Sequence, residues 1–172
     1  MIEPSKLKEA FKKVEAENNA FRIYLKKHAN ADKLDEQFLR LHNELFANYD
    51  CNQCRNCCKE LSATFEKEEL GPVSAFLEMT ESEFTLKYVE EEYGEYYLNV
   101  KPCCFLKEDG ECGLETCKPA ACRDYPYTDQ PERLFALIGI VESTSVCPVV
   151  FEMFERLKKE YGFRGRGSGI KR

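Results

Sequence analysis

The sequence predicts a mostly helical α+β fold, in which an N-terminal helical hairpin precedes a small cysteine-rich domain stapled by metal and holding a short sheet or hairpin. Three observations lead to this prediction. Apolar residues recur at helical spacing over the first 48 residues, ten cysteines follow from residue 51 onward, and one central segment alternates like a strand. We expect a helical hairpin extension at 1–49, a cysteine-cluster metal-binding domain at 50–162 and a basic flexible tail at 163–172.

The hairpin is expected to consist of two amphipathic helices. The first spans residues 5–28 with Ser5 as its N-cap, and the second follows a break at Asn30 with Asp32 as its cap. Because the link is so short, we expect an antiparallel pair that serves as a lid or brace for the cysteine domain. The apolar stripes are Leu7, Phe11, Val14, Phe21 and Leu25 in the first helix and Leu34, Phe38, Leu41 and Leu45 in the second.

The middle of the chain is expected to hold two more helices and a strand. Thr64 and Thr80 are predicted to cap helices near residues 65–78 and 81–92. Glu83 lies three residues after Thr80, which is the spacing of a capping box. Residues 96–101 alternate in the manner of a strand.

The last part of the chain is predicted to hold a strand, a helix and a disordered tail. Residues 133–141 form an apolar run that suits a buried strand or a helix, and we favour a strand because three of its residues are β-branched. Pro148 is expected to open the final helix, since proline is tolerated at the first helical turn. The buried side of that helix is predicted to be Val149, Phe151, Phe154 and Leu157.

Composition narrows the class of protein. The chain is 43% hydrophobic and 33% charged, and its net charge of −6 argues against nucleic-acid binding. No apolar stretch approaches the length of a membrane span, and the start of the chain is too charged for a secretory signal. We therefore expect a cytoplasmic protein without a membrane partner, in which disulfides are uncommon and clustered cysteines favour metal.

Four cysteines fall within eight residues, at Cys51, Cys54, Cys57 and Cys58. Such a block predicts a thiolate site for a soft metal ion or an iron–sulfur cluster. A helical segment would present all four thiols on one face, whereas a knuckle-like turn would make Cys51 and Cys54 a C-x-x-C claw. Adjacent Cys57 and Cys58 point in different directions in either case, so we expect them to serve different centres or one of them to support the other.

Negative charge in such a site needs compensation. Metal-bound cysteines are thiolates, and buried thiolates require N–H donors or nearby cations. Four basic residues lie beside cysteines in the sequence and are expected to supply part of this compensation, namely Arg55, Lys59, Lys118 and Arg123.

Further motifs follow the block in a specific order. CNQCRNCC at residues 51–58 is followed by CCFL from residue 103, CGLETCKPAACRDYP from residue 112 and Cys147-Pro148. Over about residues 50–150 these motifs resemble the YkgJ-type CxxCxxCC cysteine-cluster family, which is described as a zinc- or iron-chelating domain. The resemblance implies eight metal ligands, which are Cys51, Cys54, Cys57, Cys58, Cys103, Cys112, Cys122 and Cys147.

Eight thiolates suit two four-sulfur sites, or one cluster and other roles. Cys104 and Cys117 are extra to the family pattern, Lys118 stands where the family has arginine, and Glu115 stands where it has tyrosine. The retained Arg123 is predicted to bind the cofactor by donating N–H groups to anionic sulfur.

The cofactor is predicted to be an iron–sulfur cluster or zinc. Paired C-x-x-C spacing suits zinc, and the C-x-x-C-x-x-C run favours an iron–sulfur cluster slightly. We expect one or two thiolate centres for redox chemistry, metal handling or structural stapling, with an unknown protein or redox partner. One alternative is a cluster-dependent enzyme related to lysine methylases, which contain a similar cysteine module. Another is a zinc module that binds RNA through the basic tail, and no catalytic residue is predicted.

Overall fold

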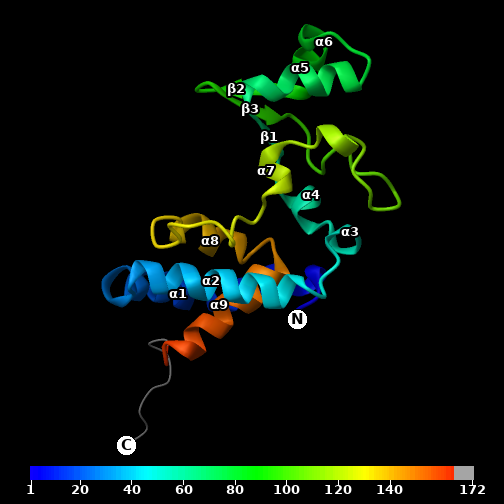
Figure 1. The fold of residues 1–172 in the computed structure, drawn as a ribbon. Coiled ribbons are helices and arrows are strands. Elements are labelled where there is room, and N and C mark those ends of the chain that lie inside the picture. The colour runs from blue at the N-terminus through cyan, green and yellow to red at the C-terminus, as the bar shows by residue number, and fades with distance from the viewer. Residues whose placement is uncertain (165–172) are drawn as a thin grey trace, which may run out of the picture. The chain divides into compact units, whose positions relative to one another are not determined.

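A computed structural model describes residues 1–164 and groups them into two compact units (Figure 1). The first unit contains residues 1–50 and 126–164, and the second contains residues 51–125. Residues 126–162, which the sequence assigns to the cysteine-cluster domain, thus group with the N-terminal helices. The expected tail lies outside the described residues from residue 165 onward.

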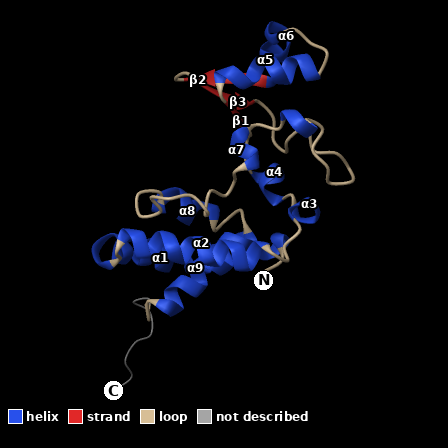
Figure 2. Ribbon diagram, viewed as in Figure 1, coloured by secondary structure: helices blue, strands red, loops and turns tan. Residues whose placement is uncertain are grey.

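The predicted mostly helical α+β fold is confirmed. Helices make up most of the regular structure, and the strands form one small sheet in the second unit (Figure 2).

Helices build the first unit. They are α1 (Pro4–His28), α2 (Ala31–Phe46), α8 (Leu137–Ser143) and α9 (Pro148–Glu160). Helix α9 packs against the other three, and α8 also packs against α1. Their apolar faces meet in a core of fully buried side chains that includes Leu7, Phe21, Leu25, Leu34, Phe38, Leu137, Val149, Phe154 and Leu157. The predicted stripes of the first two helices therefore supply much of this core.

Both predicted caps in the hairpin are wrong. Helix α1 begins at Pro4 after the N-cap Glu3, so that Ser5 lies inside the first turn. Proline suits this position because its fixed φ is helical and its missing N–H would have no partner there. Helix α2 is capped by Asn30, whose side-chain oxygen accepts a hydrogen bond from the Lys33 N–H at 2.9 Å. Asp32 lies in the first turn instead.

The strand predicted at 133–141 is also wrong, because residues 137–143 form helix α8. Leu137, Ile140 and Val141 are buried, and their spacing of three and four residues is the spacing of one helix face. Tertiary packing of this face therefore outweighs the weak strand preference of β-branched residues. The helix predicted to open at Pro148 is confirmed as α9, although Phe151 is only half-buried.

Within residues 1–164, no single helix is long and apolar enough to cross a membrane. Helices α8 and α9 meet those criteria only as a pair, and the pair is bent by 119°.

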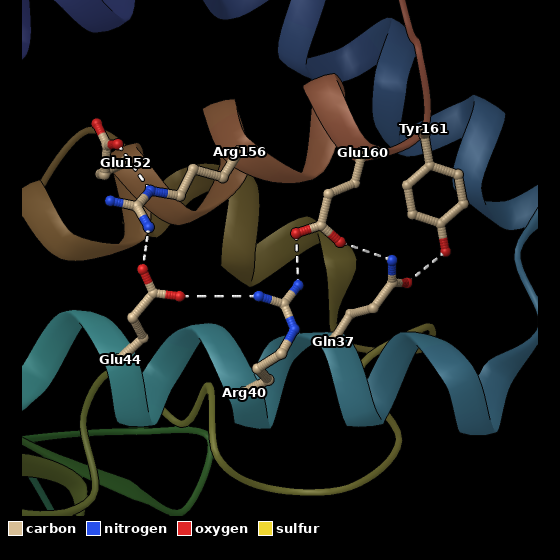
Figure 3. Close-up of polar contacts among 7 residues, drawn as sticks. All are labelled: Gln37, Arg40, Glu44, Glu152, Arg156, Glu160 and Tyr161. Atoms are coloured by element: carbon tan, nitrogen blue, oxygen red, sulfur yellow. Dashed lines mark hydrogen bonds and ion pairs between the residues drawn. The ribbon is translucent and has the colours of Figure 1, made fainter.

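A polar network joins the outer sides of α2 and α9 (Figure 3). Arg156 Nε donates to Glu152 at 2.9 Å, and its Nη1 donates to Glu44 at 2.5 Å. Arg40 donates to Glu160, and that carboxylate also accepts from Gln37 at 2.9 Å. The contacts fix the register of the two helices above their shared apolar core, although exposed ion pairs of this kind add little stability.

The second unit is built from short elements. They are α3 (Cys51–Cys54), α4 (Asn56–Glu60), β1 (Thr64–Phe65), α5 (Lys67–Phe76), α6 (Glu81–Tyr88), β2 (Val89–Glu92), β3 (Glu95–Leu98), the 3₁₀ turn η1 (Glu115–Cys117) and α7 (Ala120–Arg123). The sheet is antiparallel with the order β1-β3-β2, and Glu90 pairs with Tyr97 in its hairpin. Between β3 and the end of the second unit, η1 and α7 are the regular elements.

The elements predicted for this region are partly correct. Thr80 caps α6 in a capping box with Glu83, as predicted, but the helix ends at Tyr88 and residues 89–92 form β2. Thr64 lies in β1 and does not cap a helix. Helix α5 is capped by Glu66 in a box with Glu69. The strand expected at 96–101 is β3, which begins and ends earlier.

A small apolar cluster forms the core of the second unit. It gathers seven buried residues from β1, α5, α6, the sheet and the segment before η1, which are Phe65, Leu70, Val73, Phe84, Val89, Leu98 and Leu114. Phe65 and Phe84 meet edge to face with their ring centroids 5.7 Å apart. Cys103, Cys112 and Cys117 pack against the edge of this cluster. The apolar core thus reaches the cysteine-rich segments only at its border.

Candidate metal centre

The cysteine block forms two short helices and not one. Cys51 and Cys54 are the ends of α3, and Cys57 and Cys58 lie in α4. Between them Arg55 adopts a left-handed conformation with φ 47° and ψ 24°, which ends the first helix and starts the second. The single helical face that would present all four thiols is therefore not formed.

Three cysteines from separate segments act electrostatically on Cys122 in α7. They are Cys58 in α4, Cys103 after the sheet and Cys112 in the following turn. Burial, together with the negative charges of Cys58, Cys103 and Cys112, raises the pKa of the Cys122 thiol to about 11. Burial also raises the pKa of Cys103, with contributions from Cys58, Cys104 and Cys112. A bound metal cation would offset the negative charge of neighbouring thiolates.

The backbone places two of these segments together. The Cys103 N–H donates to the Cys58 carbonyl oxygen at 2.9 Å. Gly113 donates to the Phe105 carbonyl oxygen at 2.6 Å, and Leu106 pairs with Cys112 in an isolated bridge. Helix α7 is tied to α5, because the Ala120 N–H donates to Glu69 at 2.8 Å.

Cys58 differs from its neighbours in its acidity. A hydrogen bond with the Cys57 thiol lowers the pKa of the Cys58 thiol to about 6 against the opposing effect of burial. The positive charges of Arg55 and Lys118 act in the same direction as that hydrogen bond. Cys58 is therefore a thiolate at neutral pH, which is the form that binds metal. The contact between the adjacent thiols also agrees with the expectation that one of them supports the other.

Arg55 and Lys118 are the cations whose charge acts on this group of thiols. Lys118 acts on both Cys58 and Cys122. The guanidinium of Arg123, the residue predicted to bind the cofactor, donates to the main-chain oxygen of Lys118. Arg55, Lys118 and Arg123 were all predicted from their positions beside cysteines in the sequence. The sequence could not show which of the three acts on a thiol, because that depends on the fold.

The remaining cysteines lie in different surroundings. Cys147 is buried in the first unit at the N-cap of α9, whereas the other nine belong to the second unit. Cys51 and Cys104 are exposed, and Cys54 and Cys57 are half-buried. Cys117 packs against the apolar cluster, as an ordinary core cysteine does.

Both histidines belong to the first unit. His42 Nδ1 is 2.9 Å from Thr128 Oγ1, and the His28 ring packs on Tyr24, so both take part in contacts within the helical unit.

The donor set fits a soft metal in its chemistry and its neighbourhood. Thiolates select zinc, iron–sulfur clusters and other soft centres. Among residues 1–164, however, no three His, Cys, Asp or Glu side chains are arranged so that they could hold one ion. Cys58, Cys103, Cys112 and Cys122 would therefore have to close together by side-chain and loop movement when a metal binds.

A helical unit joined to a small unit of clustered thiols defines this chain as a cysteine-cluster protein of the metal-binding class. Residues 50–148 match the family model CxxCxxCC, whose description is "Putative zinc- or iron-chelating domain". The chain belongs to this family, as the order of its cysteine motifs predicted. No curated protein and no solved structure matches it significantly.

Proposed function

We propose that the second unit holds a metal through a four-thiolate centre formed by Cys58, Cys103, Cys112 and Cys122. The observation that carries the proposal is that the segments of these thiols meet. The Cys103 N–H donates to the Cys58 carbonyl oxygen at 2.9 Å, Leu106 bridges to Cys112, and the charges of Cys58, Cys103 and Cys112 all act on Cys122. Membership of a zinc- or iron-chelating family supports the same chemistry. When bound, the metal would neutralise the thiolates and restrain the loops that carry them.

The centre is proposed to staple the second unit, and an iron–sulfur cluster is the cofactor that we favour over zinc. Residues 99–125 contain little regular structure beyond η1 and α7, and the apolar cluster reaches them only at its edge. Segments of this kind gain order when a metal ties them together, because the binding free energy becomes folding free energy. A reducing compartment such as the cytoplasm would keep the thiols available for this role.

The other thiols predicted as ligands remain part of the proposal. Cys51, Cys54 and Cys57 would complete or support a second centre in the second unit. Cys147, at the start of α9 in the first unit, stays a predicted ligand to which we assign no centre. Arg123 is proposed to stabilise the cofactor indirectly by holding the main chain at Lys118. A protein or redox partner would act on the loaded centre.

The test is anaerobic purification of the full chain followed by analysis of metal and acid-labile sulfide. Cys122→Ser removes a proposed ligand, and Cys104→Ser serves as the matched control because Cys104 is exposed and extra to the family pattern. We expect iron and sulfide in the wild type and in Cys104→Ser, with a large loss of both in Cys122→Ser. Zinc without sulfide would contradict the iron–sulfur assignment, and negligible metal of any kind would contradict the thiolate centre itself.

A further inference from the structure

The guanidinium of Arg55 is a buried positive charge in the cysteine unit. Its side chain is only 8% exposed, although arginine is among the residues that are seldom buried. Its Nε is buried and has no hydrogen-bond partner among the described residues. Buried donors are normally satisfied, so an orphaned N–H beside a thiol cluster points to an acceptor that arrives with the ligand.

One edge of the guanidinium is already engaged. Arg55 Nη2 donates to Asn52 Oδ1 and lies 3.9 Å from Glu111 Oε2. Asn52 in turn donates to Glu111 Oε1 at 3.3 Å. These contacts tie the end of α3 to the turn at residues 107–112 and hold the Arg55 side chain in a fixed direction.

The turn packs closely against this arrangement. A Cβ added at Gly110 would lie 2.5 Å from the Asn52 carbonyl oxygen, and Gly110 has a φ of +88°. Glycine is therefore required here both by the close approach and by the backbone conformation. The same added Cβ would lie 3.9 Å from Arg55 Cγ, so the turn also borders the stem of the Arg55 side chain.

The thiol side of Arg55 faces the proposed centre. The charge of Arg55 and a hydrogen bond from its side chain both help to lower the pKa of Cys58, which is one of the four proposed ligands. A guanidinium offers five N–H donors in a rigid fork, so it can pair with a carboxylate on one edge and an anionic sulfur on another.

We propose that Arg55 is a positioning residue of the thiolate centre, whose unpartnered Nε–H donates to a metal-bound sulfur and offsets part of the negative charge there. This inference rests on the proposed metal centre and deepens it. A competing interpretation is that Arg55 serves only to staple the 107–112 turn through Asn52 and Glu111.

The experiment uses the full-length chain with Co²⁺ as a spectroscopic probe and Zn²⁺ in competition with a chelator. Arg55→Met removes both charge and donors, and Arg55→Lys keeps the charge without the fork. Both variants keep a Cβ at the left-handed position, so the backbone conformation demands no more of them than of arginine. Glu111→Gln is the matched control, because it weakens the staple without touching sulfur.

We expect Arg55→Met to lower Zn²⁺ affinity by roughly 10- to 100-fold, as changes beside metal ligands typically do. The sulfur-to-cobalt charge-transfer band should shift in energy, because the sulfur loses a hydrogen bond and becomes a stronger donor. Arg55→Lys should fall between wild type and Arg55→Met in both measurements. Glu111→Gln should keep its affinity within about threefold of wild type, well inside that range, and leave the band in place.

Three results would overturn the inference. The first is wild-type affinity and band position in Arg55→Met. The second is an equal loss of affinity in Arg55→Met and Glu111→Gln with an unmoved band, which is the signature of a staple alone. The third applies if Arg55→Met fails to fold, in which case Arg55→Lys is the deciding variant. Wild-type Zn²⁺ affinity and a wild-type band position in Arg55→Lys would then overturn the inference. A wild-type chain that binds no metal would instead contradict the proposed centre, which separates the two failures.

Discussion

The two units of this protein are held together by different means. The first buries large apolar side chains from four helices, and many of them are fully inaccessible to water. The second buries a seven-residue cluster beneath a small sheet and leaves its cysteine segments at the border of that cluster. Apolar burial is enough to order the first unit, whereas we propose that metal bound to the thiols adds to the order of the second.

The polar groups of the two units differ in the same way. In the first unit, the charged network of α2 and α9 lies on the outer side of the helices, above a complete core (Figure 3). In the second unit, the Arg55 guanidinium is buried beside thiols whose acidities are strongly altered. Altered acidity in a cluster of this kind indicates a functional site, while exposed ion pairs indicate a solvated surface.

Metal removal is expected to have the largest effect, and to affect the second unit and not the first. We expect a chelator that strips the centre to lower amide protection across residues 103–123 by several kcal/mol, since structural zinc sites bind with about 10–16 kcal/mol in small peptides. Amides of α1 and α2 should keep their protection, because none of the four thiols of the proposed centre lies in the first unit. Hydrogen exchange with and without chelator checks this. An equal loss of amide protection in both units, or no loss in either, would contradict the proposal that metal orders only the second unit.

The converse change is Phe38→Ala in the helical core. Phe38 is fully buried, so its truncation should cost about 3–5 kcal/mol in the free energy of unfolding of the first unit. Metal content per folded molecule should stay unchanged. Denaturant unfolding followed by helical circular dichroism gives the loss, and Leu39→Ala on the exposed side of the same helix is the control. A cost under 1 kcal/mol would show that the core is not what holds this unit.

A smaller effect is expected at the start of α2. Asn30→Ala removes the side-chain oxygen that caps the Lys33 N–H, and it should cost about 1 kcal/mol in the free energy of unfolding. Asp32→Ala should cost less, because Asp32 is not the cap. Thermal unfolding of the two variants compares them. The opposite order would restore the cap predicted from sequence.

The smallest effect is a pH dependence of α6. Hydrogen bonds from the Thr80 N–H and hydroxyl lower the pKa of Glu83 below its usual value. A lowered folded-state pKa stabilises the helix above the unfolded pKa of roughly 4.3, and that stability is lost as pH falls through the folded value. We expect α6 amide protection to decline below that pH in wild type and to stay flat in Glu83→Gln.

The check is an NMR titration of the Glu83 carboxyl together with amide exchange over the acidic range. Glu81, in the same first turn, serves as the internal reference. A Glu83 carboxyl that titrates at or above its ordinary value would contradict the capping box.

Local patterns in the sequence were strongest where they were long and regular. The stripes of residues 5–28 and 34–45 predicted two helices and their buried faces, and the Thr80–Glu83 spacing predicted a cap. Short apolar runs were weaker guides, since residues 133–141 satisfy both a strand preference and a helical burial pattern. Only contact with α1 and α9 decides between these two patterns.

The sequence by itself determined the chemistry of this protein, because ten cysteines in a specific order admit few uses other than soft-metal binding, and the family match agrees with that order. Tertiary structure decided which of them become neighbours. The charges of Cys58, Cys103 and Cys112 act on Cys122 because the fold brings their segments together, and Cys103 and Cys112 also pack against the apolar cluster. The sequence shows that the available ligands are thiols. Which thiols come close to one another, and which cations lie beside them, depends on how the backbone folds.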